Sequence, residues 1–429
     1  MIKRALLLYF MTLTALLSCS ICFAQESPVT ADTADLYASW RSSVVQVRVI
    51  EKQSRSKSGI GSGFVSNQSG LIVTNYHVIA DLANQPDDYD ARFLSEDGTE
   101  GSLQLVSVDV VHDLAVLSTP KPMSPGLPTA DQAPRKGTRL YSMGFPYDIG
   151  LTIVEGTYNG LLEKTLYKRL HFTGSINPGM SGGPVLNQAG QVVGINVATA
   201  GNQVGFLVPV EYARSLLDEA ADSDKSVSLD QSIASQLQIN QAAIARQLLS
   251  GDLIETRLNA FIVPGELAEW MNCWGNSLQG DSDQMKHVYY QCQSQDDIFL
   301  SDSLYTGVIR FQHDLISSES LHPLRFYHQL EKRSYFPLLR LEGNEETVTG
   351  YECQSGFIDQ DGLSFKSTFC VRGYRKMAGI YDAYLYLTSL VDGHEALQST
   401  LVLSGFDWEN LTAISQQFMG GISLEPDSP

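Results

Sequence analysis

The sequence predicts a mainly β protein made of two domains with a helical segment between them. Over the first half of the chain, short apolar and β-branched runs alternate with Gly, Pro, Asn and Asp, a spacing typical of a β-barrel or β-sandwich. These runs occupy residues 44–50, 63–65, 71–74, 114–117, 140–143, 192–197 and 206–208. A chain of 429 residues is also longer than one hydrophobic core usually supports, so two domains are expected.

The order of the predicted elements divides the chain near its middle. The first domain is predicted to span residues 36–221 and to end in a helix over residues 210–221. The polar stretch 222–228 then marks a boundary. Residues 252–429 return to strand-like alternation and predict a mostly β C-terminal domain, which ends in a helix near residues 409–418.

Residues 228–251 are predicted to form a helical linker. Apolar residues recur there at the spacing of a helix face. Ser228 with Gln231 fits a capping box at the start of this helix, and Gly251 suits its end. We expect the helix to pack against one domain or the other and to connect the two.

Residues 1–24 have the order of a secretory signal peptide, with two cations, an apolar run and small residues. The apolar run, residues 5–17, is shorter than the roughly 20 residues that span a bilayer, so a retained anchor is disfavoured. Cleavage is predicted after Ala24. The residues before Cys19 also resemble a lipoprotein box, and lipidation there stays an alternative. The mature protein is therefore expected to be exported, periplasmic or secreted, without a stable membrane span.

The charge of the chain excludes one class of partner. Its 48 acidic and 29 basic residues give a formal net charge of -19. A chain this acidic repels the phosphate backbone of nucleic acids. No nucleic-acid partner is expected.

Four cysteines remain after signal cleavage, an even number that predicts two disulfides in an exported chain. The Asp-Gly pair at residues 361–362 signals a two-residue hairpin turn. Cys353 and Cys370 are equally distant from this turn, so they face each other on a non-hydrogen-bonded pair, within disulfide range. Cys273 pairs with Cys292 by elimination. Reduction is expected to loosen the C-terminal domain and to leave the cysteine-free first domain active.

The most specific motif in the first domain is "NPGMSGGPV", residues 177–185. A hydroxyl is a weak nucleophile, so a catalytic serine needs an exposed turn, a base and donors for the oxyanion. The glycines of this motif permit such a turn around Ser181. The backbone N–H groups of Gly179 and Ser181 are the expected oxyanion donors. The alternative is an ordinary glycine-rich hairpin.

Two further motifs supply a base and a carboxylate. "GSGFVSNQSGLIVTNYHVI", residues 61–79, places His77 after an apolar strand, and an imidazole can take and return the serine proton. "HDLAVLSTP", residues 112–120, places Asp113 before an apolar strand, where a carboxylate can orient the imidazole. The chain order His, Asp, Ser is that of the chymotrypsin class. His112 is interpreted as a structural or surface residue, because neighbours on a strand point to opposite faces.

Through "GSGF", "TNYHVI", "DLAVL", "NPGMSGGPV" and "VVGINVA", the first domain resembles the HtrA (Deg) branch of the trypsin-like serine proteases. The resemblance implies a chymotrypsin-like double β-barrel with the active site between the barrels. It implies cleavage of proteins or peptides without a metal or an organic cofactor. Carried over by position, His77 is the general base, Asp113 its orienting partner and Ser181 the nucleophile, with Gly179 and Ser181 as the oxyanion hole.

Two positions depart from other trypsin-like enzymes. Met180 stands where zymogen-activated relatives carry an Asp, so no activating cut is implied. Ser175 stands where trypsin carries a carboxylate at the base of its specificity pocket, which leaves a basic P1 residue without a partner. Ile195 and Val197 are expected on the wall of the same pocket. Small or medium apolar P1 residues are therefore expected.

The resemblance stops before the C-terminal domain. The peptide-binding loop of a PDZ domain, which most HtrA proteases carry there, is not found, and the four cysteines are unexpected in such a module. Three interpretations of the whole chain compete: an active protease, a protease-like binding protein or chaperone, and an adhesin or envelope-binding module. The role of the C-terminal domain and the oligomeric state are not predicted.

Overall fold

The computed structural model describes residues 29–67, 71–121, 123, 125–199, 201, 203–222, 227–251, 253–279, 284–333, 341–360, 362–390 and 393–425. The predicted signal peptide, with Cys19 and the cleavage site, lies outside these residues. By its contacts the chain forms a short unit that ends at Ser39 and a long unit from Trp40 to Pro429. Residues 29–39 of the helix α2 (Val29–Trp40) make up the described part of the short unit, and Trp40 and the elements that follow belong to the long unit.

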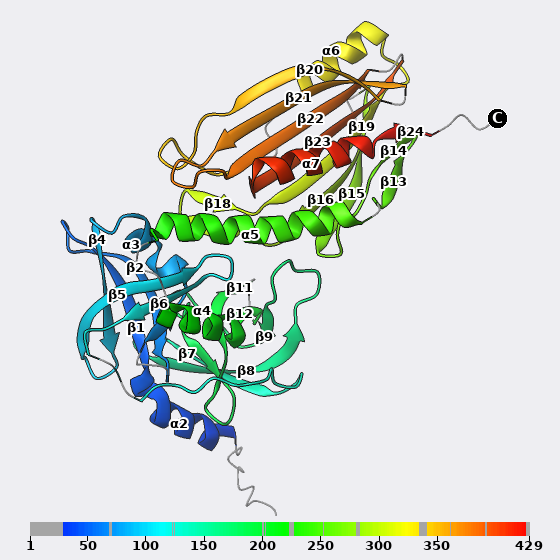
Figure 1. Cartoon of the computed structure of the whole chain (residues 1–429). Helices are drawn as coiled ribbons and strands as arrows, with labels where there is room; N and C mark the ends of the chain where they lie inside the picture. Colours follow the sequence, from blue (N-terminus) through cyan, green and yellow to red (C-terminus); the bar gives the residue numbers. More distant parts are fainter. Residues whose placement is uncertain are drawn as a thin grey trace, which may run out of the picture. The chain divides into compact units, whose positions relative to one another are not determined.

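The first half of the long unit consists of two closed antiparallel barrels of six strands each (Figure 1). The first barrel has the strand order β1-β2-β3-β6-β5-β4 and the second β10-β11-β12-β9-β8-β7. This architecture confirms the predicted double barrel. The strands are β1 (Val44–Glu51), β2 (Lys57–Val65), β3 (Ile72–Thr74), β4 (Tyr89–Ser95), β5 (Glu100–Asp109), β6 (Leu114–Ser118), β7 (Arg139–Gly144), β8 (Thr152–Leu161), β9 (Leu170–Phe172), β10 (Pro184–Leu186), β11 (Val192–Thr199) and β12 (Gly205–Pro209).

Short helical elements occupy several connections between these strands. They are η1 (Arg41–Ser43), η2 (His77–Ile79), α3 (Ala80–Asn84) and η3 (Pro146–Asp148), and α4 (Val210–Asp222) follows the last strand. The seven apolar runs seen in the sequence fall on β1, β2, β3, β6, β7, β11 and β12. The strands β4, β5, β8, β9 and β10 lie outside these runs. Along β5, buried and exposed residues are mixed, so no continuous apolar run marks it.

The second half of the chain is built around a seven-stranded antiparallel sheet with the order β15-β16-β19-β23-β22-β21-β20. Beside it stand a three-stranded sheet, β13-β14-β24, and the hairpin β17-β18. Their bounds are β13 (Glu255–Leu258), β14 (Phe261–Pro264), β15 (Met271–Gln279), β16 (Lys286–Ser294), β17 (Ile298–Ser301), β18 (Leu304–Thr306), β19 (Ile309–Ser317), β20 (Glu352–Gln360), β21 (Leu363–Gly373), β22 (Tyr381–Leu390), β23 (Glu395–Phe406) and β24 (Ser423–Leu424).

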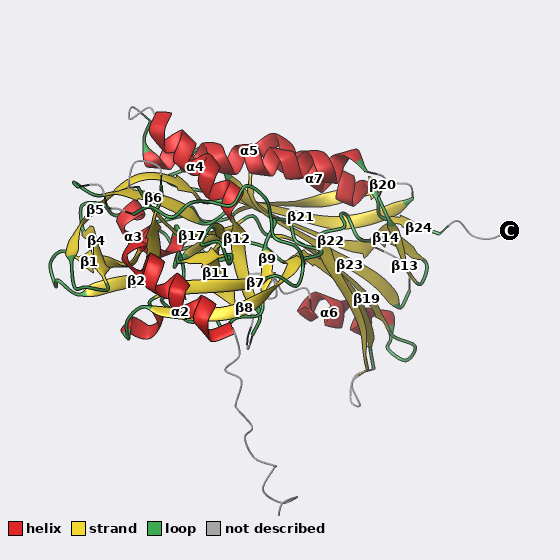
Figure 2. Cartoon of the chain, turned by 90° about the horizontal axis from the view of Figure 1, so that it is seen from below, coloured by secondary structure: helices red, strands yellow, loops and turns green. Residues whose placement is uncertain are grey.

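Helices cover both faces of the seven-stranded sheet. The helices α5 (Leu229–Ser250) and α7 (Trp408–Gly420) share one apolar core with one face. On the other face, α6 (Pro323–Arg333) packs Phe326 and Leu330 against Ile316 and Ala396. Figure 2 shows α5 and α7 on one side of the sheet and α6 on the other. No helix among the described residues is long and apolar enough to cross a membrane.

Each edge of the seven-stranded sheet is fastened to its neighbour by a disulfide. Cys353 on the edge strand β20 bonds Cys370 on β21, with Cα atoms 4.0 Å apart. At the other edge, Cys273 on β15 bonds Cys292 on β16, with Cα atoms 4.1 Å apart. Both bonds agree with the predicted pairing. The register agrees as well, since Gln360 pairs with Leu363 across the turn.

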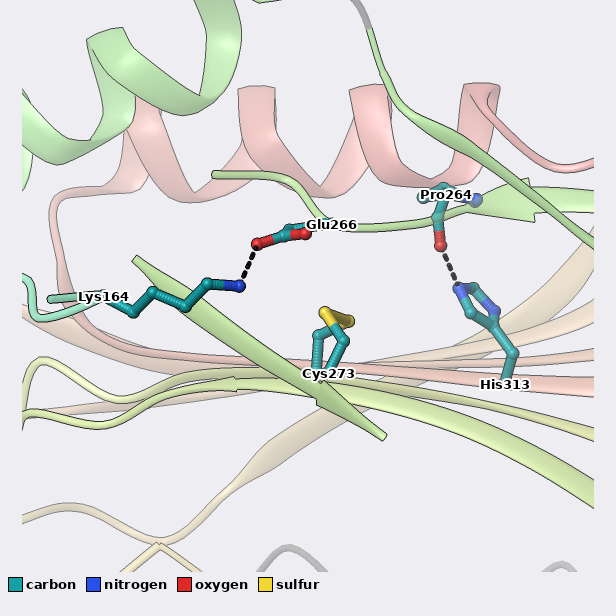
Figure 3. The surroundings of a disulfide bond; sticks show 6 residues. Lys164, Pro264, Glu266, Cys273 and His313 are labelled. Atoms are coloured by element: carbon teal, nitrogen blue, oxygen red, sulfur yellow. Dashed lines mark hydrogen bonds and ion pairs between the residues drawn. A yellow bond between two sulfur atoms is a disulfide. The ribbon is translucent and has the colours of Figure 1, made fainter. Parts of the chain in front are cut away.

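Around the Cys273 disulfide, two polar contacts tie neighbouring segments together (Figure 3). Lys164, on the connection between β8 and β9, forms an ion pair with Glu266 at 3.4 Å. His313 on β19 lies 3.0 Å from the carbonyl oxygen of Pro264. Burial lowers the pKa of His313 to about 3, so it is a neutral structural residue.

The helix α5 belongs to both halves of the long unit. Its start has the predicted capping box, with Ser228 and Gln231 exchanging hydrogen bonds. Leu237 is fully buried in a core shared with the first barrel, whereas Leu248 lies in the core of the seven-stranded sheet. The helix therefore packs against both domains and connects them, as expected of the linker. In one contact, Gln236 donates to the carbonyl of Val108 at 2.7 Å.

Candidate active site

His77 and Asp113 meet at the end of the first barrel. His77 begins η2, shortly after β3, and Asp113 directly precedes β6, the strand that pairs with β3. The carboxylate Oδ1 of Asp113 accepts the backbone N–H of His77 at 2.9 Å, and its Oδ2 lies 2.6 Å from the ring Nδ1. These contacts direct Nδ1–H toward the carboxylate and leave Nε2 free to take a proton.

Asp113 has a strained backbone conformation at this position. Its φ of 60° lies in the left-handed region, which costs L-residues about 1 kcal/mol and which Asp tolerates better than most. The carbonyl of Asp113 accepts hydrogen bonds from Tyr76 N–H at 3.2 Å and from Asn75 Nδ2 at 2.7 Å. The two residues before His77 therefore hold the strained backbone in place.

The environment of His77 favours the protonated ring. Burial disfavours a charge on the ring, but the negative charge of Asp113, its hydrogen bond and the charge of Asp302 together outweigh burial. They hold the pKa of His77 above its usual value. A base of this kind can accept a serine proton and stabilise the resulting imidazolium.

Ser181 lies in the loop between β9 and β10, and a serine of the first barrel holds this loop. The backbone N–H of Ser62 donates to the carbonyl of Ser181 at 2.7 Å. The Oγ of Ser62 donates to the carbonyl of Gly179 at 2.7 Å and accepts the N–H of Phe145 at 2.9 Å. Because Ser62 is fully buried, water cannot replace these bonds. One residue of β2 thus fixes the carbonyls of both predicted oxyanion residues.

Asn196 on β11 holds the same loop from the second barrel. Its carbonyl accepts the N–H of Gly182 at 2.9 Å, and its Nδ2 donates to the carbonyl of Met180 at 3.3 Å. Gly182 has a φ of +83°, and a Cβ there would lie 2.2 Å from the carbonyl oxygen of Ser62. Any larger residue at this position would push the loop away from the first barrel. Met180 is fully buried in the core of the second barrel.

The peptide before Gly179 is oriented by the loop that follows β7. The carbonyl of Pro178 accepts the N–H of Tyr147 at 2.9 Å. In a trans peptide the N–H points opposite to the carbonyl, so the N–H of Gly179 points away from that loop. Gly179 has a φ of +94°, and a Cβ there would lie 2.4 Å from the carbonyl oxygen of Phe145. Among the described residues, the N–H groups of Gly179 and Ser181 have no acceptor.

Asp148 anchors the loop that orients Pro178. It accepts a hydrogen bond from Gln46 at 2.9 Å, forms an ion pair with Lys57, and lies 3.6 Å from Arg48. The hydrogen bonds of Lys57 and Gln46, with the two cationic charges, lower the pKa of Asp148 below its usual value. The carboxylate therefore stays ionised and ties this loop to the first barrel.

The strand β2 lies between the segments that carry His77 and Ser181. A Cβ added at Gly61 would lie 2.5 Å from side-chain carbons of Val78 and 3.1 Å from the carbonyl oxygen of Ser181. The segments of His77 and Ser181 are thus adjacent. Within the described part of the chain, no hydrogen bond joins Ser181 to the His77 ring. Such bonds are often long without substrate and shorten in the reacting complex.

A cavity of about 570 Å³ opens beside the His77–Asp113 pair. Of the predicted specificity residues, Val197 lines this cavity. Ile195 is fully buried within β11, and Ser175 is exposed and does not line it. The opposite wall comes from the C-terminal half, including the hairpin β17-β18.

His112 has a structural environment, as expected. Its Nδ1 lies 2.7 Å from the carboxylate of Asp109, and its ring stacks on Tyr212 of α4 at 3.6 Å. It also meets Tyr167 edge-on. These contacts fasten α4 and the connection between β8 and β9 to the segment before Asp113.

Sequence reasoning missed three contributors to this site: Ser62, Asn196 and the hairpin β17-β18. Ser62 and Asn196 stand inside the quoted motifs "GSGF" and "VVGINVA". Their roles were hidden because their partners are distant in sequence, 117 residues for Ser62 and Gly179. The hairpin carries no motif, and no signal in one sequence points to it.

Comparison with known proteins agrees with this architecture. Residues 61–195 match the model of the trypsin-like peptidase domain. The chain is 32% identical over 177 residues to protease Do-like 1, chloroplastic, of Arabidopsis thaliana, covering 38% of this chain and 39% of that protein. It is 32% identical over 178 residues to the serine endoprotease DegS of Escherichia coli K12, covering 37% and 48%. The chain thus spans less than half the length of these curated relatives.

Among solved structures, a serine endoprotease from Yersinia pestis is 26% identical, covers 44% of this chain and 67% of its own, and superposes with a TM-score of 0.39. The double barrel and the family match together define the class of the first half. It is an HtrA-like, trypsin-fold peptidase domain. The family match ends at residue 195, before α5 begins.

Proposed function

We propose that this protein is an exported serine endopeptidase, with Ser181 as nucleophile, His77 as general base and Asp113 as the residue that orients His77. The observation that carries the proposal is the 2.6 Å contact between His77 Nδ1 and the Asp113 carboxylate, beside a rigidly held serine loop. Such a pair has a catalytic use when a nucleophile stands on the Nε2 side.

The proposed reaction proceeds through an acyl-enzyme. Ser181 Oγ attacks the scissile carbonyl as His77 Nε2 takes its proton. The N–H groups of Gly179 and Ser181, which have no acceptor among the described residues, bind the oxyanion. His77 then returns the proton to the leaving amine. In the second half of the reaction, water attacks the ester of the acyl-enzyme, His77 takes a proton from the water, and it returns this proton to Ser181 Oγ as the acid product leaves. These steps use side chains and backbone of this chain and call for no cofactor.

The proposal includes a preference for small or medium apolar P1 residues. Ser175 carries no charge, and Ile195 and Val197 are apolar. A Lys or Arg side chain in this subsite would lose its hydration without gaining a carboxylate partner. A peptide library scanned at P1 measures the preference. Cleavage mainly after Lys or Arg would contradict it.

Export is proposed on two grounds. The N-terminal residues have the order of a signal peptide. The disulfides Cys273–Cys292 and Cys353–Cys370 are of a kind that persists in oxidising compartments. N-terminal sequencing of the mature protein tests this step, with a start after Ala24 as the expected result and a lipidated Cys19 as the contrary one.

The activity is tested with purified wild-type protein and Ser181→Ala on a mixture of denatured proteins. Peptides released by the wild type and absent with the variant would identify a serine endopeptidase. Labelling of Ser181 by a fluorophosphonate probe gives an independent measurement. A wild-type protein that releases no peptides and is not labelled would instead favour a protease-like binding protein or chaperone.

A further inference from the structure

The hairpin β17-β18 of the C-terminal half packs directly against the segment that carries His77. The carbonyl of Leu300 accepts hydrogen bonds from the Tyr76 hydroxyl at 3.1 Å and from Asn84 Nδ2 at 2.9 Å. Leu300 and Leu304 are buried in the same core as residues of the first barrel. The hairpin is therefore an integral neighbour of the active site.

Phe299 brings this hairpin into contact with the catalytic base. Its ring meets the His77 ring edge-on, with centroids 6.2 Å apart and an interplanar angle of 83°. Phe299 also lies edge-on to Tyr305, with centroids 5.3 Å apart. The hairpin thus presents an aromatic surface next to His77, where a substrate chain passes the catalytic group.

The base of the hairpin is fixed by a buried polar network. The hydroxyl of Tyr374 donates to Thr306 at 2.7 Å or to Asp382 at 2.8 Å. Asp382 also accepts a hydrogen bond from Arg372 at 2.7 Å. These side chains are buried, and a buried network with its bonds satisfied is rigid. The hairpin is held in place from the core of the C-terminal half.

The cavity beside the active site lies between this hairpin and the second barrel. Its barrel wall includes Val197 and Ala198 of β11, and its opposite wall includes Phe299, Asp302 and Tyr305. His77 and Asp113 also line it. A substrate strand that adds along β11, with its scissile carbonyl at Ser181, would place the residues before P1 in this space.

The charges that line the cavity are mostly negative. Asp296, Asp297 and Asp302 line the C-terminal side, and Arg169 is the one Lys or Arg that lines it in the described part of the chain. Asp296 accepts the N–H of Leu166 at 2.7 Å. Asp297 and Asp302 are exposed and form no ion pair with any described residue. Their carboxylates are therefore available to a substrate.

Two further features suit a bound peptide. Asp297 as a whole residue is exposed, but partial burial of its carboxylate and the neighbouring charge of Asp296 raise its pKa above the usual value. A cation placed there would oppose this shift. Arg169, the one Lys or Arg among the described residues of the lining, has an Nη1 that is buried and without a hydrogen-bond partner. The cavity thus offers mainly carboxylates to the side chains of a bound peptide.

We propose that the hairpin β17-β18 forms one wall of the substrate groove, and that Asp297 and Asp302 select substrates with basic side chains at P2 to P4. This inference rests on the proposed function and adds a role for the C-terminal half. The apolar preference concerns P1, and the basic preference concerns the residues before it. The expected substrate is thus a basic peptide segment ending in an apolar P1 residue.

The test compares full-length wild type with Asp297→Asn, Asp302→Asn and the double variant. Peptides of constant P1 carry Lys or Glu at P2, P3 or P4, and kcat/KM gives the Lys-to-Glu ratio. The wild type should favour Lys. Each substitution should lower the ratio about two- to fivefold, as expected of an exposed ion pair. The preference should weaken in high salt, because exposed charges are screened.

Glu352→Gln is the matched control, since Glu352 is an exposed residue of β20 that does not line the cavity. It removes the same charge and should leave the ratio unchanged. Equal cleavage of Lys and Glu peptides by the wild type would overturn the inference. An unchanged ratio in the double variant would overturn it as well.

Binding separates this inference from the proposed activity. Fluorescent peptides of the same sequences are titrated against Ser181→Ala, which needs no turnover. Tighter binding of Lys peptides, lost with Asp297→Asn/Asp302→Asn, supports the groove even if the wild type cleaves nothing, whereas equal binding overturns it. Absent labelling and cleavage by the wild type would count against the proposed function alone.

Discussion

The two halves of the molecule differ in how the edges of their β-sheets are arranged. The six strands of each barrel in the first half form a closed sheet, and residues 36–221 contain no cysteine. The sheet of the second half is open, and each of its two edge strands is joined to its neighbour by a disulfide. Open edges invite pairing with other chains. The two disulfides are therefore found in the half whose sheet is open, and not in the half whose sheets are closed barrels.

The difference does not make the halves independent. Leu237 of α5 is buried in a core with residues of the first barrel, and Leu248 of the same helix is buried with the sheet. The hairpin β17-β18 adds Leu300 to the first of these cores. The three residues of the proposed triad lie in one half, and part of the wall of the cavity beside them comes from the other.

The largest effects are expected inside the catalytic group. His77→Ala and Ser181→Ala should each lower kcat by about 10⁴ to 10⁶, because they act as one proton-transfer unit. Asp113→Asn should cost about 10⁴, since the ring would lose its correct tautomer. Steady-state kinetics on a cleaved peptide measures these losses, with circular dichroism to show an unchanged fold. Near-normal activity in any of these variants would remove that residue from the group.

The next largest effect is expected on stability, from a substitution in α5, the helix that both halves share. Leu237 is fully buried, so Leu237→Ala should lower the free energy of unfolding by about 2–5 kcal/mol. Urea unfolding should show peptidase activity and sheet structure lost in one transition. Ile239→Ala is the control, because Ile239 on the same helix is 70% exposed and such changes stay within about 0.5 kcal/mol. Two separate transitions in the wild type would show that the halves unfold independently.

The disulfides allow a comparison between the two sheet edges. Cys353→Ser/Cys370→Ser should lower the free energy of unfolding by roughly 3 kcal/mol, from the chain entropy of the closed loop. Activity at 25 °C should persist, because this bond lies on the edge away from β16. Cys273→Ser/Cys292→Ser should cost a similar free energy. In contrast to the expectation from the sequence alone, it should also lower activity, since β16 leads through Asp296 into the hairpin β17-β18. Equal activity in the two double variants would contradict the second expectation.

A smaller effect is expected at the contact between the barrels. Ser62→Ala removes the hydroxyl that donates to the carbonyl of Gly179 and accepts the N–H of Phe145. The loop keeps its backbone bond from position 62, so kcat should fall by about tenfold, less than the loss of an oxyanion donor itself. KM should change little. An effect on KM alone would mean that Ser62 supports substrate binding rather than the oxyanion geometry.

What the sequence could predict depends on the range of the interactions. The turn of the serine loop could be predicted because Gly179, Ser181 and Gly182 lie within four residues of one another. The backbone conformation that such glycines permit is a local property of the sequence. The Cys353–Cys370 register followed from one turn. Contacts such as Tyr76 with Leu300, separated by 224 residues, depend on how whole elements pack. No local pattern encodes them, so the wall beside His77 emerged only from the structure.

The last prediction uses that wall to probe His77 through its charge. The groups around the ring are Asp113, which contacts it, and Asp302, while Asp297 and Arg169 line the same cavity. Burial lowers the pKa of His77, but the charges of Asp113 and Asp302 raise it above the usual value. His77 must be neutral to accept the proton of Ser181, so activity is lost as the pH falls through this pKa.

Asp302→Asn removes one of the charges that favour the protonated ring, so it should lower the pKa of His77. The acid limb of the kcat/KM profile should then move to lower pH, and the variant should keep more of its activity in acid than the wild type. Asp302→Glu keeps the charge and should keep the wild-type limb, whereas high salt should bring the wild type closer to Asp302→Asn. A limb that stays in place or moves to higher pH would show that the hairpin does not act electrostatically on the catalytic base.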